Sequence, residues 1–332
     1  MNLRLATFAL IVAATPVAAE VNIYSYRQPE LVQPLLDAFT EATGIQTNVA
    51  FLDKGMVQRL QAEGARSPAD VILTSDISRL TEAVEAGVTQ PVDSAAIAAA
   101  IPASLRDPNN HWFGLTTRAR VVYASRDRVA DGEVTTYEDL ADPKWAGRIC
   151  TRSGLHAYNI ALTSAVITRG GAEAARGWLE GLKANLARKP QGNDRAQVKA
   201  IWAGECDISL GNTYYMGLMQ ADPDQQDWAK SVRIVFPVFE AGGTHVNLSG
   251  MAMTAAAPHR DDALALMEFL ASPTAQQIYG ATNYEYPVTP GVAPSDTVAA
   301  WGTLTPDTTS LADIAGHRPE ALRLTETVDF DG

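Results

Sequence analysis

Cysteine is almost absent from this 332-residue chain, which contains only Cys150 and Cys206. Two cysteines cannot supply the four ligands of a structural zinc site, and these two do not form a Cys-x-x-Cys redox pair. After the N-terminus there is no run of ~18 apolar residues of the kind that a membrane-spanning helix needs. The sequence also lacks a Gly-x-Ser-x-Gly elbow, a His-Glu-x-x-His motif, a Walker-type phosphate loop and a dinucleotide fingerprint. We therefore expect neither an enzyme nor a membrane-spanning protein.

Basic residues are in deficit. There are 26 Lys and Arg against 38 Asp and Glu, which gives a formal net charge of −12 at pH 7. The basic residues are scattered, so we expect no nucleic-acid partner. Net charge governs solubility and long-range steering, and it does not indicate the charge of a ligand held in a buried site.

The N-terminus has the pattern of a secretory signal peptide. Arg4 supplies the positive end, Leu5–Val12 the apolar core, and Val17–Ala19 a small-residue cleavage site. We expect cleavage after Ala19 and a soluble, monomeric protein in the periplasm. In that oxidising compartment a structural disulfide between Cys150 and Cys206 is favoured over two free thiols.

Strands and helices alternate in the first part of the mature chain. The expected strands are Val21–Ser25, Ile45–Phe51 and Asp70–Leu73, and the expected helices are Pro29–Thr43, Met56–Gly64 and Ile77–Ala86. This alternation is typical of a mainly parallel sheet with helices on both faces. Proline in the first turn and Gly44 at the end support the first of these helices.

A second lobe is expected further along, because single cores stop growing near about 250–300 residues. Gly114–Tyr123 is a long strand pattern without a following helix, which we interpret as a crossing into that lobe, and Val232–Phe236 as the return crossing. The expected elements between and after them are the strands Gly147–Cys150 and Cys206–Leu210 and the helices His156–Thr168, Ala172–Leu186, Arg195–Ala203, Asp261–Ala271 and Pro273–Ala281. We predict a signal peptide at 1–19, lobe 1 from 20–117 plus 240–290, and lobe 2 from 118–239 plus 291–332, with a hinged cleft between the lobes.

Tyr214 and Tyr215 are the candidate ligand residues. They follow the strand Cys206–Leu210 and precede a helix expected from Met216, and ligands of open α/β sheets bind at the carboxyl ends of the strands. A phenol has a free pKa of about 10, so only a strongly charged, hard cation displaces its proton at neutral pH. The alternative is that one tyrosine packs in the core and the other caps a surface.

Four stretches of the chain resemble the periplasmic ferric-iron-binding proteins of ABC transporters, the bacterial transferrin-like family. They are Tyr24–Pro29, Ser67–Val71, Asn212–Tyr215 and Leu270–Gln276. The resemblance spans essentially the whole mature chain. It implies a two-lobed α/β fold of the type II periplasmic binding proteins, with the ligand in the cleft. It also implies a solute-binding protein that delivers ferric iron to the permease and ATPase of an ABC importer.

The resemblance implies Tyr214 and Tyr215 as iron ligands and Tyr158 as a third. Gln28 stands where other members have a ligating His or Tyr, and Ser75 or Asp76 where they have a Glu, so no ligand from lobe 1 is identified. The chain is most similar to the subgroup that binds iron through three tyrosines plus an anion. Hard ferric ion prefers anionic oxygen, so this donor set suits it.

The anion is expected to be carbonate or bicarbonate, held by backbone N–H groups and a positive partner. The candidates for this role, or for orienting the anion, are Arg27, Gln28, Ser153, Gly154 and Asn212. Tyr26 is a rival ligand or a hydrogen-bond donor behind the ligands. We expect only one of Arg118 and Arg120 to face the cleft, with salt-bridging as their role, and we interpret His245 as a hydrogen-bonded structural histidine.

Two other functions remain open from the sequence. One is a binding protein of the same fold for an organic or oxyanion solute, such as a polyamine, sulfate or phosphonate. The other is ferrous-iron binding, which the tyrosine cluster disfavours because ferrous iron prefers imidazole or carboxylate more. Colour separates them, since tyrosinate-to-ferric charge transfer makes a loaded protein orange to red.

Overall fold

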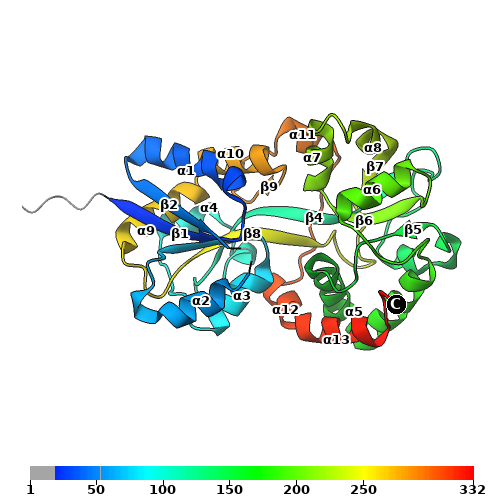
Figure 1. Ribbon diagram of the computed structural model, residues 1–332, viewed down its shortest axis with the longest axis horizontal. Helices are drawn as coiled ribbons and strands as arrows, with labels where there is room; N and C mark the ends of the chain where they lie inside the picture. The colour runs from blue at the N-terminus through cyan, green and yellow to red at the C-terminus, as the bar shows by residue number, and fades with distance from the viewer. Residues whose placement is uncertain (1–18, 53) are drawn as a thin grey trace, which may run out of the picture.

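The computed structural model describes residues 19–52 and 54–332, so nearly all of the predicted signal peptide lies outside the described residues. Two lobes lie side by side and are joined by long strands (Figure 1). No helix in the described part of the chain is long and apolar enough to cross a membrane.

Lobe 1 is built around three parallel strands. β1 (Glu20–Ser25) lies between β2 (Gln46–Phe51) and β3 (Val71–Thr74). The helices that cover these strands are α1 (Pro29–Thr43), α2 (Met56–Glu63), α3 (Ile77–Glu85), α4 (Ala95–Ala100), α9 (Arg260–Ala271) and α10 (Pro273–Asn283). Helix α1 ends at Gly44, whose φ of 77° needs a residue without a side chain.

Two strands cross between the lobes. β4 (Phe113–Ser125) is buried along its whole length and pairs with β8 (Val246–Met253), which also pairs with β3. The prediction that Val232–Phe236 is the return crossing is wrong, because β7 (Val232–Val235) stays in lobe 2 and pairs with the far end of β4. Four residues at about 3.3 Å each are too short to join two lobes.

Lobe 2 continues from the far half of β4. There β4 pairs with β6 (Ile208–Asn212), and β6 pairs in parallel with β5 (Ile149–Cys150). The helices of this part are α5 (Ala157–Ala184), α6 (Asp194–Trp202), α7 (Tyr214–Ala221), α8 (Gln226–Ser231), α12 (Leu311–Gly316) and α13 (Arg318–Thr327). Helix α5 is kinked at Gly171, where φ is 82°, so it consists of two helical pieces that meet there, as the two predicted helices on either side of this residue do.

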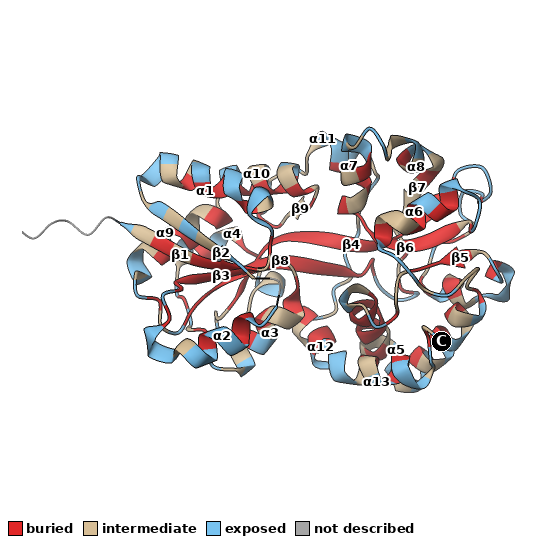
Figure 2. Ribbon diagram, in the orientation of Figure 1, coloured by how far each residue is buried: buried red, intermediate tan, exposed pale blue. Residues whose placement is uncertain are grey.

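The sheet is therefore mixed, with strand order β2-β1-β3-β8-β4-β6-β5. It is parallel at both ends and antiparallel through the crossing strands. The inner strands β3, β8, β4 and β6 are the most buried part of the molecule, whereas the edge strand β2 is partly exposed, and the helices expose their outer faces (Figure 2). The remaining short elements are β9 (Tyr286–Pro287), which pairs with β4, the helix α11 (Asp296–Ala299), and the 3₁₀ helices Gly64–Arg66, Ala103–Leu105, Glu138–Ala141 and Pro143–Trp145. The predicted two-lobed α/β fold is confirmed.

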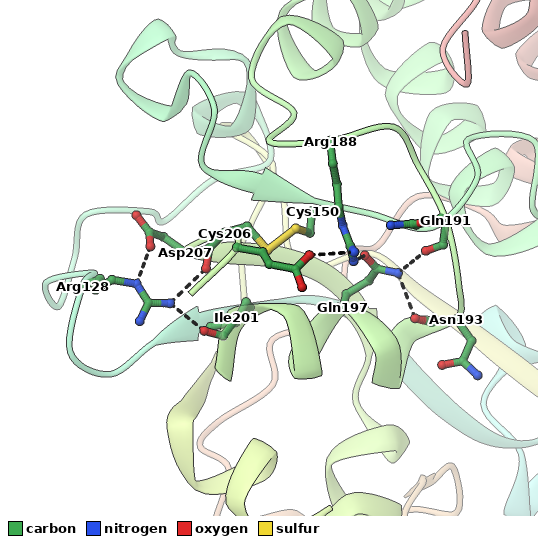
Figure 3. The surroundings of a disulfide bond; sticks show 10 residues. Arg128, Cys150, Arg188, Gln191, Asn193, Gln197, Ile201, Cys206 and Asp207 are labelled. Carbon is green, nitrogen blue, oxygen red and sulfur yellow. Dashed lines mark hydrogen bonds and ion pairs between the residues drawn. A yellow bond between two sulfur atoms is a disulfide. The ribbon is translucent and has the colours of Figure 1, made fainter. Parts of the chain in front are cut away.

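The two cysteines are joined in a disulfide (Figure 3). Cys150 ends β5, and Cys206 lies in the connection between α6 and β6, with 5.9 Å between the two Cα atoms. Both cysteines are buried. The bond therefore ties the α6–β6 connection to the strand that leads into the loop before Tyr158.

Candidate functional site

The tyrosine pair lies where β6 ends and α7 begins. The helix starts at Tyr214, two residues earlier than expected, and Gly211 and Asn212 belong to the strand instead of the turn. The strand continues because Gly211 pairs with Val121 of β4. A side chain at Gly211 would collide with the ring of Tyr123, so this strand position requires glycine.

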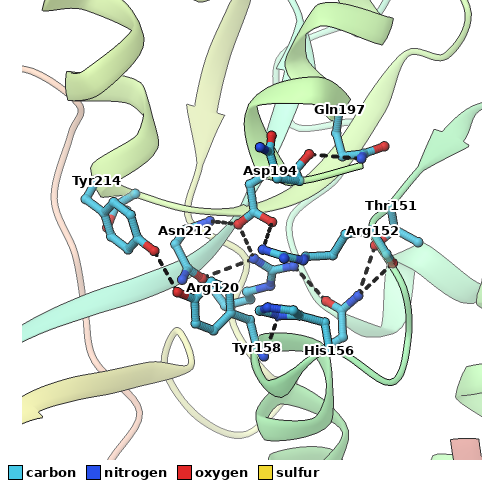
Figure 4. A network of polar contacts seen from close by, with 12 residues as sticks. Arg120, Thr151, Arg152, His156, Tyr158, Asp194, Gln197, Asn212 and Tyr214 are labelled. Carbon is cyan, nitrogen blue, oxygen red and sulfur yellow. Dashed lines mark hydrogen bonds and ion pairs between the residues drawn. The ribbon is translucent and has the colours of Figure 1, made fainter. Parts of the chain in front are cut away.

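Three tyrosines meet at this point. Tyr158 lies in the first turn of α5, and its Oη is 3.0 Å from Oη of Tyr214 (Figure 4). The ring centroids of Tyr214 and Tyr215 are 4.3 Å apart. The structure therefore brings together the three side chains that the sequence analysis singled out, from segments that are 56 residues apart in the chain.

Burial keeps the phenols of Tyr214 and Tyr215 protonated when nothing is bound. Burial, with the neighbouring Tyr158 and Tyr215, raises the pKa of Tyr214 well above its ordinary value. Burial, followed by the nearby Tyr158 and Asp194, raises the pKa of Tyr215 to about 12. A ligand that binds phenolate oxygen must therefore displace a proton from each of these two groups.

Asp194 organises the segments that carry the tyrosines (Figure 4). Its fully buried carboxylate accepts hydrogen bonds from Arg120 at 2.7 Å and Arg152 at 3.1 Å, and from the backbone N–H of Asn212 at 3.0 Å. Arg120 in turn donates to the side chains of Asn212 and Asn159 at 3.1 and 2.6 Å. Asn159 is the neighbour of Tyr158, and Asn212 lies two residues before Tyr214, so one buried network holds both ends of the site.

Arg118 and Arg120 line the same small cavity as Tyr158, Asn212 and His245. The expectation that only one of the two arginines faces the cleft is wrong, because residues two apart on a strand share a face. Arg120 makes the expected salt bridge, with Asp194. Arg118 is 2% exposed and donates to Ser249 Oγ at 3.4 Å and to the carbonyl oxygen of Ser75. Among the described residues no carboxylate lies within 4.0 Å of its guanidinium.

Arg27 is a buried residue with a partner. Its guanidinium pairs with the fully buried carboxylate of Glu285 at 2.7 Å, and donates to Ser249 Oγ at 2.5 Å and Tyr279 Oη at 3.2 Å. Burial opposes its charge most strongly, but Glu285, Tyr279 and Tyr214 together outweigh burial and raise the pKa of Arg27 above its ordinary value. Arg118 donates to the same Ser249 Oγ, so the guanidinium groups of Arg27 and Arg118 lie close together.

Ser153 and Gly154 are occupied by another part of the chain. The carboxylate of Asp331 accepts from Ser153 Oγ and, at 2.7 Å, from the backbone N–H of Gly154. These groups were expected to bind the anion, and the structure instead turns them toward the C-terminal end. The sequence alone does not show this, because the contact joins positions 177 residues apart.

Tyr26 and Gln28 are not brought to the three tyrosines. Oη of Tyr26 accepts from the backbone N–H of Met56 at 2.9 Å, and Arg79 lies over its ring at 3.8 Å. Gln28 is exposed at the start of α1, and its side chain forms no hydrogen bond with the described residues. Both residues belong to the edge of lobe 1 in this arrangement.

Residues 35–306 match the family model of bacterial extracellular solute-binding proteins. The chain belongs to this family. Iron uptake protein A1 of Synechocystis sp. is 44% identical over 295 residues, which is 88% of this chain and 82% of that protein.

Two solved structures of similar proteins have the same fold. Ferric iron-binding protein A of Mannheimia haemolytica, in an open conformation, superimposes with a TM-score of 0.91 at 50% identity, covering 95% of this chain and 100% of that chain. FutA (IdiA) of Trichodesmium, in complex with iron and citrate, superimposes with a TM-score of 0.90 at 40% identity, covering 94% and 100%. The resemblance to ferric-iron-binding proteins that the sequence motifs indicated is confirmed.

In this solute-binding protein the cavity beside the tyrosines is also lined by Asn212, His245 and Asn247. Across residues 19–52 and 54–332, no group of three or more His, Cys, Asp or Glu side chains is placed to hold a metal. His245 is buried, and its backbone N–H donates to Tyr137 Oη at 3.0 Å. Its backbone carbonyl oxygen accepts from the N–H of Arg120 at 3.0 Å, and its ring forms no hydrogen bond with the described residues, so this buried histidine is hydrogen-bonded through its backbone.

No sequence pattern predicted a role in the site region for three acidic residues, Asp194, Glu285 and Asp331. Each is recognised only through a partner far away in the chain, at separations of 74, 258 and 177 residues. Asp194 has the pattern of an ordinary acidic residue in the first turn of a helix, because Asn193 caps α6 directly before it. No local signal distinguishes these three from surface acids.

Proposed function

We propose that this protein captures ferric iron in the periplasm through the phenolate oxygens of Tyr158, Tyr214 and Tyr215. The observation that carries the proposal is the 3.0 Å approach of the Tyr158 and Tyr214 hydroxyl groups, with the Tyr215 ring directly beside them. Relatives over most of the chain are named for iron uptake or ferric iron binding, which supports the same cargo here.

The donor set favours ferric over ferrous iron. Phenolate is a hard, anionic oxygen donor, and three of them cancel the charge of one ferric ion in a cleft where an uncompensated charge is costly. Ferrous iron would favour imidazole or carboxylate ligands more, and among the described residues no cluster of such side chains is placed to hold a metal.

An oxyanion such as carbonate or bicarbonate completes the proposed site. Arg118 is buried, faces the cavity beside the tyrosines and has no carboxylate partner among the residues described, so an anion there would satisfy its charge. Arg27 donates to the same Ser249 Oγ as Arg118, but Glu285 already balances its charge. We therefore assign Arg118 the larger share of anion binding, with Arg27 and Asn212 beside it.

Delivery of the iron follows from the two-lobed form. The lobes are joined by the crossing strands β4 and β8, and we propose that they open and close around the cargo by bending at these strands. Family membership supports a solute-binding role, and we propose that the protein is a monomer which hands ferric iron to the permease and ATPase of an ABC importer. We assign it no catalytic activity.

Colour tests the proposed function directly. The wild-type protein, loaded with ferric iron in bicarbonate buffer, is expected to develop a visible tyrosinate-to-iron band. Tyr158→Phe, Tyr214→Phe and Tyr215→Phe are each expected to remove most of that band and to lower the affinity more than about 100-fold, because each removes a direct ligand.

Tyr26→Phe is the matched control. Its hydroxyl contacts the backbone of Met56, so this variant is expected to retain the band and the affinity. A single site variant that keeps the full band shows that its tyrosine is not a ligand. A wild-type protein that stays colourless with ferric iron rejects the proposal and favours an organic or oxyanion cargo.

A further inference from the structure

The end of the chain is docked on the loop that leads to Tyr158. We propose that Phe330 and Asp331 form a clasp that positions Tyr158 by holding the loop Thr151–Leu155 in place. The consequence for iron rests on the proposed function, whereas the clasp itself can be tested in the iron-free protein.

Asp331 binds the donor side of the loop. Its two carboxylate oxygens accept from Ser153 Oγ and from the backbone N–H of Gly154, the latter at 2.7 Å. Ser153 Oγ also accepts from the backbone N–H of Leu155 at 3.1 Å. The carboxylate thus satisfies groups that would otherwise face solvent just before α5 begins, and hydrogen bonds to a charged acceptor are the stronger kind.

Phe330 closes the contact with its ring. It is 3% exposed, and a Cβ atom added at Gly154 would lie only 2.5 Å from its Cδ1 atom. The ring therefore fills the space that the missing side chain of Gly154 leaves. Helix α13, which precedes Phe330, packs along α5, and Lys183 of α5 donates to the carbonyl oxygen of Val328 at 3.1 Å.

Asn159 holds the same loop from the inner side. Its side-chain N–H groups donate to Thr151 Oγ1 and to the carbonyl oxygens of Arg152 and Ser153, each at 3.1 Å. The loop is thus fixed between two anchors, the Asp194 network on the cleft side and the C-terminal residues on the outer side. Asn159 donates hydrogen bonds to oxygen atoms of the loop, and Asp331 accepts hydrogen bonds from its O–H and N–H groups.

The position of Tyr158 depends on the position of this loop. The backbone N–H of His156 donates to the carbonyl oxygen of Ser153 at 3.2 Å, and the N–H of Tyr158 donates to Nδ1 of His156 at 3.2 Å. A displacement of Ser153 is therefore transmitted to the first turn of α5. The quantity it changes is the distance between the Tyr158 and Tyr214 hydroxyl groups.

Two variants remove the clasp from opposite partners. Asp331→Ala removes the carboxylate, and Gly154→Ala places a methyl group against Phe330. Both are expected to raise the amide hydrogen-exchange rate of residues 153–158 in the iron-free protein by roughly tenfold, since each hydrogen bond to a charged group contributes substantially to local stability. Both are also expected to speed iron release and to shift the visible band, which global destabilisation alone would not do.

Each variant has a control that makes the same kind of change at a site away from the clasp. Gly177→Ala adds a methyl group to the same helix α5, where nothing lies within 4 Å of it, and Asp227→Asn removes an exposed carboxylate. Neither is expected to change exchange at 153–158 or iron release. Asp331→Glu keeps the carboxylate and is expected to recover most of the protection.

Unchanged exchange at 153–158 in Asp331→Ala overturns the clasp. Faster exchange with an unchanged band and release rate overturns its role in positioning Tyr158. If the wild-type protein binds no ferric iron, the proposed function fails, and the exchange data still decide whether the clasp exists.

Discussion

The arginines next to the tyrosines outnumber the carboxylates that pair with them. Arg120 and Arg152 share the single carboxylate of Asp194, and Arg27 pairs with Glu285. Arg118 is buried beside them without a carboxylate within 4.0 Å in the described part of the chain. Such a surplus of positive charge is costly in an empty cleft, so it is more naturally explained by an anionic occupant than by stability.

His245 contributes a pH-dependent term to stability. Burial and then the neighbouring Arg120 lower the pKa of His245 to about 4, with Arg118 acting in the same direction and Asp307 opposing. Between pH 6.5 and 4 the unfolded chain binds a proton that the folded protein does not, so stability falls as the pH drops through this window. A full shift of this size corresponds to about 3 kcal/mol.

We therefore expect His245→Gln to have a melting temperature that falls less between pH 7 and 4.5 than that of the wild type. His317→Gln alters an exposed histidine and is the control, expected to follow the wild type. The measurement is thermal unfolding of the iron-free protein across this pH range. Parallel curves for wild type and His245→Gln would contradict the assignment.

At the scale of elements, the site depends on the junction of β6 with α7 and of β5 with α5. The Asp194 network joins these two junctions on the cleft side, and the disulfide joins them behind it. Because Cys150 directly precedes Thr151, the covalent bond and the loop that leads to Tyr158 are adjacent in the chain.

The disulfide predicts a simple chemical result. Thiol titration of the unfolded, unreduced protein is expected to find no free thiol. Replacing both cysteines with serine should lower the free energy of unfolding by up to about 4 kcal/mol, because the bond closes a long loop in the unfolded chain. Two titratable thiols in carefully handled protein would reject the bond.

At the scale of the whole molecule, the proposed binding of ferric iron is coupled to the release of protons. The pKa values of Tyr214 and Tyr215 are raised, so iron bound to their phenolate oxygens would displace their protons, and its affinity would decrease as the pH falls. An oxyanion between the lobes adds a second acid-sensitive component, whereas arginine does not titrate in this range.

We expect the visible band of the loaded protein to fade in mildly acidic buffer. The pH midpoint should move upward when carbonate is excluded, and further upward in Arg27→Ala and Arg118→Gln, because each change weakens the anion's contribution. The midpoints are compared by absorbance titration with and without carbonate. Equal midpoints in every condition would mean that neither arginine binds a synergistic anion.

Local sequence patterns were sufficient to predict most of the strands and helices of this protein and to suggest its candidate site. The alternation from Val21 to Ala86 indicated the first lobe, and the position of Tyr214 and Tyr215 after a buried strand identified the candidate site. The predictions of strands and helices succeed because strand and helix periodicity, caps and turn residues act over a few neighbouring positions. The ends of the elements were predicted less accurately. The predicted strand ends at Leu210, whereas β6 extends to Asn212 because it pairs with β4, a contact that no local pattern shows.

Long-range contacts decided the rest. Whether Arg27 is free or bound depends on Glu285, and whether the N–H of Gly154 is open to an anion depends on Asp331. The return crossing is β8 because Val246–Met253 pairs with both β3 and β4, whereas β7 pairs only with the lobe 2 end of β4. The sequence determined which side chains are chemically able to bind iron. The tertiary structure decided which of them are left unpaired, because a buried charge or hydrogen-bonding group takes its partner from any segment that the fold brings beside it.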